Sequence, residues 1–382
     1  MDIPVDYETL RLIWWLLLGV LLIGFAVMDG FDLGVGTLLP FVARTDLERR
    51  VTINTIGPVW DGNQVWLILG AGAIFAAFPP IYAAAFSGFY FAMFLALVAL
   101  ILRPVGFDFR NKIQDARWRK AWDWALFTGG FVPALIFGVA FGNLLQGVPF
   151  TIDANFRFAY QGGLLGLLNP FALLAGLVSV AMLVAHGAAY LMIKTENPVA
   201  GRARTALMLV APAAAALFAL AGVWVAAGID GYVLAAPAVT DGPSNPLLSE
   251  VIRAPGAWMT TFAAHPWMWL GPLLGIGGAL AAALAARAWM ALPALLGTAF
   301  SVVGIVATAG LAMFPFMMPS SLQPNASLTV WDASSSHLTL FVMLVSTLIF
   351  MPIILGYTSF VFRVLRGKVT ADYVTGNDKT LY

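Results

Sequence analysis

The sequence contains no cysteine and few charged residues: 10% of its 382 residues are charged and 61% are hydrophobic. Soluble proteins carry about 25% charged residues. Without cysteine, the chain forms no disulfide, thiolate metal site, iron–sulfur cluster or thiol nucleophile. The low charge excludes a disordered chain, a nucleic-acid binder and an ordinary soluble enzyme, because so much apolar surface could not be covered in water. The remaining solvent is lipid, so the composition predicts a membrane protein.

Nine apolar stretches are long enough to cross a bilayer, which takes about 20 residues of helix. The sequence therefore predicts an all-α integral membrane protein with nine transmembrane helices. Their hydropathy divides into two four-helix bundles, within residues 1–160 and 161–330, followed by one extra helix and a tail in residues 331–382. The nine expected spans are residues 11–39, 51–78, 81–102, 124–145, 170–193, 205–228, 267–286, 289–314 and 338–364.

The distribution of Lys and Arg predicts the orientation of these helices. Alternating the nine spans places all but three of the 20 cations on one side of the membrane, and the exceptions are Arg11, Arg157 and Arg253. Short cytoplasmic loops are enriched in Lys and Arg. We therefore expect the N-terminus outside the cytoplasm and the C-terminus inside it.

Several polar residues fall at membrane depth, where a charge costs at least ~2.5 kcal/mol. Asp29 and Asp32 are three positions apart in the first span and share one helix face. The second span carries Asn54, Asp61 and Gln64 on or near one face, and Asp61 lies at a depth similar to that of Asp29. Two interpretations stay open: interhelical hydrogen bonds that hold the bundle together, or a path for protons or cations.

The arginine at the end of the third span and the histidines give weaker evidence for a function. Arg103 ends the third span and could pair with Asp108 or Asp123, or it could be a cytoplasmic anchor. His186 is the one histidine expected within a span, and it is interpreted as a packed core residue. A haem with two histidine ligands needs two of them at membrane depth, so we predict no haem ligand, no metal site and no complete catalytic centre in this chain.

Motifs along the whole chain, in order, carry a resemblance. The sequence closely resembles subunit II of the bacterial cytochrome bd-type quinol oxidases. The matching stretches include residues 10–15, 24–36 with Asp29-Gly30-Phe31-Asp32, Trp60-Asp61-Gly62-Asn63-Gln64-Val65-Trp66, 83–90, 103–108, 140–150, 221–224, 228–232, 312–316, 318–321, 325–329 and Trp331-Asp332-Ala333.

This resemblance implies a function in a complex of the bacterial cytoplasmic (inner) membrane. The family's oxidase oxidises quinol and reduces oxygen to water, with haem b and haem d in a partner, subunit I. Subunit II is haem-free and packs against subunit I as a heterodimer. In some members it holds a structural quinone, for which ubiquinone is the candidate here, and small single-helix accessory subunits often accompany the pair.

The resemblance also implies roles for individual residues. Asp61 corresponds to an aspartate that lines a cytoplasmic proton path, and Tyr382 to a tyrosine that reaches the same entrance. Asp29, Arg103 and Asp123 match positions of functional or structural importance without a defined role. Two alternatives are a stand-alone ion-coupled transporter and a scaffold in which the acids only join helices.

Overall fold

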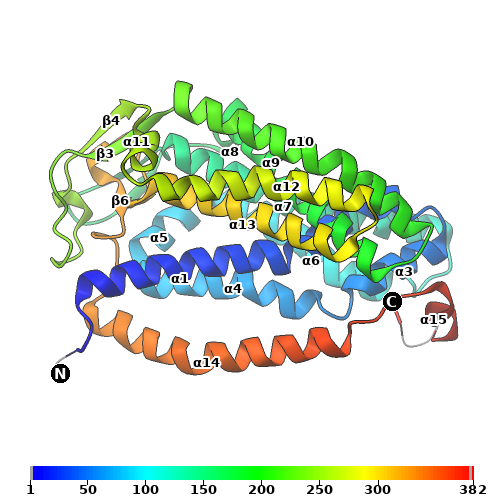
Figure 1. Cartoon of the computed structure of the whole chain (residues 1–382). Coiled ribbons are helices and arrows are strands. Elements are labelled where there is room, and N and C mark those ends of the chain that lie inside the picture. Colours follow the sequence, from blue (N-terminus) through cyan, green and yellow to red (C-terminus); the bar gives the residue numbers. More distant parts are fainter. Residues whose placement is uncertain (1–2, 378–380) are drawn as a thin grey trace.

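The computed structural model describes residues 3–377 and 381–382, and most of them are helical. The long helices run side by side along one direction of the molecule (Figure 1). In the described chain, eight helical segments are long and apolar enough to cross a membrane. They are Tyr7–Val42, Tyr90–Phe109, Ala116–Gln146, Pro170–Lys194, Val199–Gly228, Pro266–Arg287, Ala291–Met313 and His337–Val364. The prediction of a helical membrane protein is confirmed, and eight of the nine expected spans correspond to these segments.

The first three expected spans are each divided. Helices α1 (Tyr7–Met28) and α2 (Gly30–Val42) meet at Asp29, but main-chain hydrogen bonds continue across the junction and keep one path. The second expected span forms α3 (Asp46–Ile56) and α4 (Trp60–Ala77), which are separated by a turn at residues 57–59. Pro58 in this turn has no N–H to continue a helix. The third span forms α5 (Pro79–Gly88) and α6 (Tyr90–Phe109).

The rest of the chain consists of helices joined by short strands. The helices are α7 (Ala116–Gln146), α8 (Leu164–Leu167), α9 (Pro170–Lys194), α10 (Val199–Gly228), α11 (Ala257–Ala264), α12 (Leu270–Arg287), α13 (Ala291–Met313), α14 (His337–Val364) and α15 (Ala371–Gly376). The strands are β1 (Phe150–Ile152), β2 (Phe158–Tyr160), β3 (Asp230–Leu234), β4 (Val251–Pro255), β5 (Phe316–Met318) and β6 (Leu328–Thr329), and they pair in sequence order as three antiparallel sheets.

Helix α9 is the most buried of the eight spanning segments and packs against α2, α7, α10 and α13. Gly34 of α2 faces Leu183 and Gly187 of α9 so closely that a Cβ on Gly34 would overlap the main chain of α9. Such close approach of two backbones is typical of small residues in membrane bundles. At the other extreme, α14 lies at the edge of the bundle (Figure 1), with Leu340 as its buried residue.

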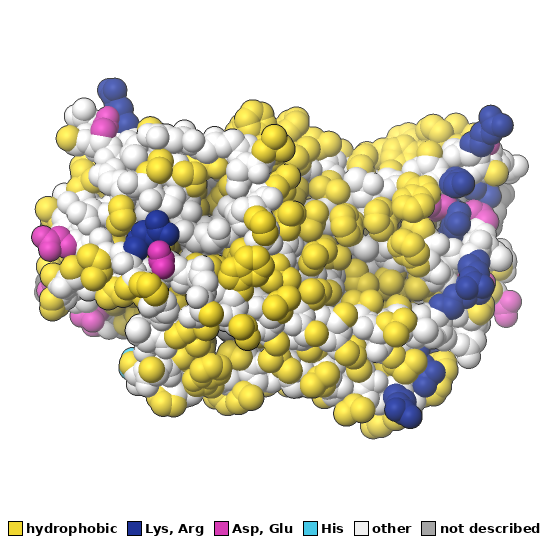
Figure 2. All heavy atoms as spheres, turned by 90° about the horizontal axis from the view of Figure 1, so that it is seen from above, with side chains coloured by type: hydrophobic (Ala, Val, Ile, Leu, Met, Phe, Trp, Pro, Cys, Tyr) yellow, Lys and Arg dark blue, Asp and Glu magenta, His cyan; other side chains and the backbone are white. Residues whose placement is uncertain are grey.

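The two ends of the bundle differ in structure and charge. The strands gather at the end that holds the first described residues, which we call the hairpin end (Figure 1). Lys and Arg side chains gather at the opposite end, with α3 and α15, which we call the basic end. Figure 2 shows that the face between these ends is largely hydrophobic. A largely hydrophobic face between polar ends is the surface expected of a chain surrounded by lipid or by apolar partner helices.

Candidate functional site

Four polar side chains meet in the core, three from helices α2, α4 and α6 and one, Asp29, from the junction of α1 and α2. Arg103 of α6 donates two hydrogen bonds to Asp29, from Nη2 to Oδ1 at 2.7 Å and from Nη1 to Oδ2 at 2.9 Å. Nη2 of Arg103 also lies 3.7 Å from Oδ2 of Asp32 in α2, and Asn63 of α4 donates to that same oxygen at 2.9 Å. All four residues are at most 2% exposed. We call this group the core charge cluster.

The core charge cluster corrects one sequence-based expectation. Pairing of Arg103 with Asp108 or Asp123 is wrong, because Arg103 is held by Asp29. Arg110, at the end of α6, pairs with Asp123 of α7 instead, with Nε 2.6 Å from Oδ1. Arg103 lies two helical turns before Arg110 in α6, about 10 Å away at the helical rise, and at that depth the facing acid is Asp29.

Asp123 belongs to a second ion-pair group at the basic end. It accepts from Arg110 and, at 2.6 Å, from Arg49 of α3. Asp46, at the start of α3, accepts from Arg110 and from Arg119 at 2.9 Å each. This group joins α3, α6 and α7 where the helices leave the apolar band. Asp123 is therefore not part of the core charge cluster.

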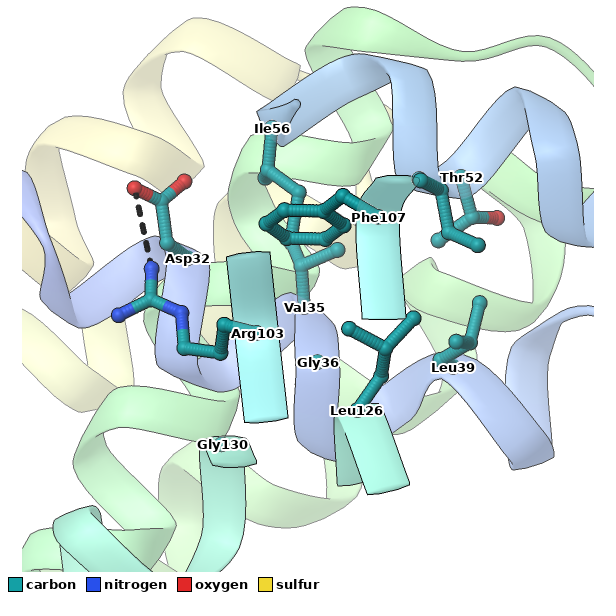
Figure 3. Close-up of a pocket in the computed structure, with 11 residues that line it drawn as sticks. Asp32, Val35, Gly36, Leu39, Thr52, Ile56, Arg103, Phe107, Leu126 and Gly130 are labelled. Carbon is teal, nitrogen blue, oxygen red and sulfur yellow. Dashed lines mark ion pairs between the residues drawn. The ribbon is translucent and has the colours of Figure 1, made fainter. Parts of the chain in front are cut away.

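A small cavity lies beside Asp32, between α2, α3, α6 and α7 (Figure 3). Its volume is about 10 Å³, which is room for about one water molecule and nothing larger. Figure 3 shows the carboxyl of Asp32 turned toward Arg103, while Val35, Phe107 and Leu126 form the apolar wall. The geometry therefore describes a closed ionic group rather than a pocket for a substrate.

Asp61 lies outside the core charge cluster, although Asn63 of the same helical turn belongs to it. The Asp61 side chain is exposed in the first turn of α4, and no hydrogen bond or ion pair joins it to another described residue. Gln64 is half-buried. The expected single row of Asn54, Asp61 and Gln64 is thus divided between different surroundings.

Asn54 instead binds Tyr382, the last residue of the sequence. The Nδ2 group of Asn54 donates to the main-chain oxygen of Tyr382 at 2.7 Å, and the Tyr382 N–H donates to Oδ1 of Asn54 at 3.1 Å. Arg50 donates to the same main-chain oxygen at 3.3 Å. The Tyr382 ring packs near Phe107, with centroids 5.8 Å apart, and against Gly57 in the turn before α4. Tyr382 is therefore fixed beside the helix break that precedes Asp61.

His186 of α9 has both ring nitrogens engaged in the core. Nδ1 lies 2.8 Å from the hydroxyl of Thr298, and Nε2 lies 3.0 Å from the carbonyl oxygen of Val27. These contacts agree with a packed core histidine. Among the described residues no group of three or more His, Cys, Asp or Glu side chains is placed to hold a metal ion.

A larger cavity of about 480 Å³ lies on the hairpin side of the bundle, between α1, α7, α9, α10, α12 and α13. Its wall is almost wholly apolar, with Phe25, Met182 and Phe218 among the larger side chains, and its hydroxyl groups are Ser179 and Thr308. Its volume falls in the usual range of small-molecule sites. This cavity suits a long apolar molecule with a small polar group.

A buried polar cluster at the hairpin end was not predicted. Arg11 is fully buried and donates to the hydroxyl of Ser334 at 2.8 Å and to the carbonyl oxygens of Thr240 and Gly242. Burial raises the pKa of nearby Asp332, although the Thr329 N–H donates to its carboxyl. Arg11 thus connects α1 to the loops beyond α10 and α13.

Sequence reasoning also missed the inward position of Asn63 and the burial of Arg110. Asn63 belongs to the Trp-Asp-Gly-Asn-Gln motif, so the motif itself was a signal. Arg110 looked like one of many cations near a span end, and nothing in its sequence position separates it from exposed neighbours such as Lys112.

Comparisons with known proteins give one consistent result. The family described as cytochrome bd terminal oxidase subunit II matches residues 10–365. Cytochrome bd-I ubiquinol oxidase subunit 2 of Escherichia coli (strain K12) is 53% identical over 99% of this chain and 100% of its own length. Cytochrome bd ubiquinol oxidase subunit 2 of Bacillus subtilis (strain 168) is 33% identical over 94% of this chain and 96% of its own. The solved structure of bd oxidase from Geobacillus thermodenitrificans contains a chain with a TM-score of 0.66 and 15% identity, covering 93% of this chain and 98% of that one, which shows a shared fold.

Proposed function

This chain belongs to the family of cytochrome bd terminal oxidase subunits II, and we propose that within the oxidase it conducts protons from the basic end of the molecule past Tyr382 and Asp61. The chain is a subunit of a quinol:oxygen oxidoreductase complex in the bacterial inner membrane. A stand-alone transporter is not favoured, because the identity to oxidase subunits extends over nearly the whole chain.

The exposed carboxyl of Asp61 is the observation that carries the proton-path proposal. A charged group on a membrane-depth helix requires water, a partner or a proton, and Asp61 has no partner within the described chain. The turn before it is bordered by the Tyr382 ring, and beyond that ring lie Arg50 and the basic end. A carboxyl in such a position can accept a proton from one side and pass it to a group on the facing subunit.

The facing subunit is proposed to be the haem-bearing subunit I. It would supply haem b and haem d, as the resemblance to the family implies. The bare faces of α4, which carries Asp61, and of α14 leave apolar surface for helices of subunit I, accessory single-helix subunits or lipid. In this arrangement the subunit stabilises its partner and completes the proton path, and quinol and oxygen react on subunit I.

The larger apolar cavity is proposed to hold a structural ubiquinone. Its apolar wall fits an isoprenoid tail, and the hydroxyl of Ser179 could donate to a quinone carbonyl, whereas the Thr308 hydroxyl already donates to the carbonyl oxygen of Gly304. The lining therefore fits the group, with the Ser179 hydroxyl as its donor. When bound, the quinone would fill space between α7, α9 and α13 and stabilise their packing.

The finer topology also remains a proposal. We count α3 and α4 together as one span, the second in chain order, interrupted at Pro58, which brings the total to nine. We place the N-terminus in the periplasm and the C-terminus in the cytoplasm. The division into bundles within residues 1–160 and 161–330, followed by residues 331–382, is kept on the same basis. The concentration of Lys and Arg at one end supports this orientation (Figure 2).

Replacement of Asp61 by asparagine in the purified complex tests the proton-path proposal. Asp61→Asn should leave haem content unchanged and lower the rate of oxygen uptake with quinol by on the order of 100-fold, the lower part of the range for positioned proton-transfer groups. Asp61→Glu should recover part of the rate. Asp108→Asn is the matched control, because Asp108 is also exposed near the basic end. A wild-type rate in Asp61→Asn would show that Asp61 does not carry the protons.

A further inference from the structure

The core charge cluster contains one more acid than base. Asp29 and Asp32 face a single cation, Arg103, and their exposures are 0%, 1% and 2%. Asn63 completes the cluster as a neutral amide. If both carboxyls were ionised, the core would hold an uncompensated negative charge, which is among the most costly features of a buried site.

The hydrogen bonds divide the two acids into different roles. Arg103 spends both terminal nitrogens on the two oxygens of Asp29, a bidentate geometry that favours a carboxylate there. Asp32 receives one bond, from Asn63 to Oδ2. Its other oxygen, Oδ1, receives no hydrogen bond from the residues that the structure describes. Nη2 of Arg103, which binds Asp29 at 2.7 Å, lies 3.7 Å from Oδ2 of Asp32, so the two carboxyls share this one nitrogen.

Helix α9, which packs against α2, does not supply the missing positive charge. It presents His186 and Tyr190 near the cluster, with the Tyr190 hydroxyl donating to the carbonyl oxygen of Thr55 in α3. His186 is held by Thr298 and by Val27. Neither makes an ion pair with Asp29 or Asp32.

We propose that Asp29 and Asp32 together bind one proton, carried on Oδ1 of Asp32 and donated in a hydrogen bond to the Asp29 carboxylate. The proton comes from the solvent when the subunit assembles, and no other bond forms or breaks. It gives Oδ1 of Asp32 its missing interaction and brings the charge of the cluster to zero. Two buried carboxyls that share one cation would leave an uncompensated charge if both were ionised, so one bound proton gives the neutral arrangement.

This proton site is distinct from the proposed path through Asp61. The Asp61 carboxyl is exposed, whereas the four residues of the cluster are at most 2% exposed, and the cavity beside it has room for about one water molecule. The bound proton is therefore retained rather than passed on. The proposal does not depend on whether Asp61 conducts protons, and each can fail separately.

Infrared spectroscopy of the whole purified oxidase tests the proposal. Aspartate labelled with carbon-13 at its side-chain carboxyl separates aspartate bands from lipid and backbone bands. The wild-type complex should show a protonated-carboxyl C=O band that disappears in Asp32→Asn. The same band should disappear in Asp29→Asn, because the remaining Asp32 would then ionise opposite Arg103. Asp123→Asn is the matched control and should leave the band unchanged, since Asp123 is a buried acid held by two arginines.

Assembly provides a second measurement. Asp32→Asn replaces a neutral group by a neutral group of the same shape, so the variant should assemble with wild-type haem content. The double variant Asp29→Asn, Asp32→Asn leaves Arg103 without a counterion and should lose far more assembled complex than the two single variants combined. A band that persists in Asp32→Asn would overturn the proposal. So would a wild-type spectrum without an acid band that depends on this pair, or failure of Asp32→Asn to assemble.

Discussion

Gly57 offers a way to displace Tyr382 without changing Tyr382 itself. The backbone of Gly57 has φ −49° and ψ −40°, which alanine adopts freely. A Cβ there would lie 2.6 Å from Cε2 of the Tyr382 ring and nearer still to Cδ2. Carbon atoms in contact are normally about 3.5–4.0 Å apart, so in Gly57→Ala the ring has to move by about 1 Å. We expect the Tyr382 ring to move, because it is the end of a side chain, whereas Gly57 lies in the backbone between α3 and α4.

The energetic terms of this substitution oppose each other. Replacing glycine by alanine in an allowed conformation stabilises by about 0.4–1 kcal/mol through the unfolded chain. Overpacking costs about 1–3 kcal/mol when the neighbour cannot yield, and less here because Asn54 holds the main chain of Tyr382 rather than its ring. We therefore expect the subunit to assemble with a net change of no more than about 2 kcal/mol, and with the ring shifted from Phe107.

The assay combines two measurements on the same variant: the rate of oxygen uptake, and hydrogen–deuterium exchange in the C-terminal residues. Hydrogen–deuterium exchange of peptides from residues 371–382 should become faster in Gly57→Ala, and oxygen uptake with quinol should fall while haem content stays at the wild-type value. Gly376→Ala is the matched control, because a Cβ on Gly376 would meet no atom within 4 Å. If exchange shows that the tail has moved but the rate of oxygen uptake is unchanged, Tyr382 does not lie on the proton path.

Two further variants test other parts of the structure. Arg103→Met leaves two buried carboxyls without a cation and should destabilise the complex by about 3–5 kcal/mol, measured as lower thermal stability. Arg119→Met removes a partly exposed ion pair and should cost about 0–1 kcal/mol. Equal effects of the two variants would contradict the argument from burial. Met182→Trp places a larger side chain in the 480 Å³ cavity. The amount of quinone that organic solvent extracts from the purified complex should then fall relative to wild type, and an unchanged amount would show that the quinone does not bind in this cavity.

The spans were predictable because lipid imposes a simple requirement. A helix that crosses a bilayer must be long and apolar throughout, and this pattern is visible in a single sequence. Eight expected spans correspond to observed helices. The divided second span was harder, since α4 begins with Trp60, Asp61 and Asn63 and is less apolar than the others. Pro58 was the local signal for its break.

The partners of the charged residues were less predictable than the spans. Arg103 could reach an acid on any neighbouring helix, and the sequence does not give the rotation or depth of α6 against α1 and α2. Proximity along the chain favoured Asp108 and Asp123, whereas the fold brings Asp29 to Arg103. Long-range pairs of this kind depend on helix packing. A membrane helix is apolar on every face, so its sequence does not specify which face meets which neighbour.

Asp61 and Asn63 show how one structural fact resolves such an ambiguity. Residues two positions apart on a helix lie about 200° apart around its axis. The side chains of Asp61 and Asn63 therefore cannot face the same neighbour. Asn63 donates to Asp32 in the core, and this contact turns Asp61 outward, away from the bundle of its own subunit. An outward carboxyl at membrane depth would be costly against lipid. The same hydrogen bond that completes the core charge cluster therefore turns Asp61 to the outer face of α4, where the proposed proton path would leave this chain.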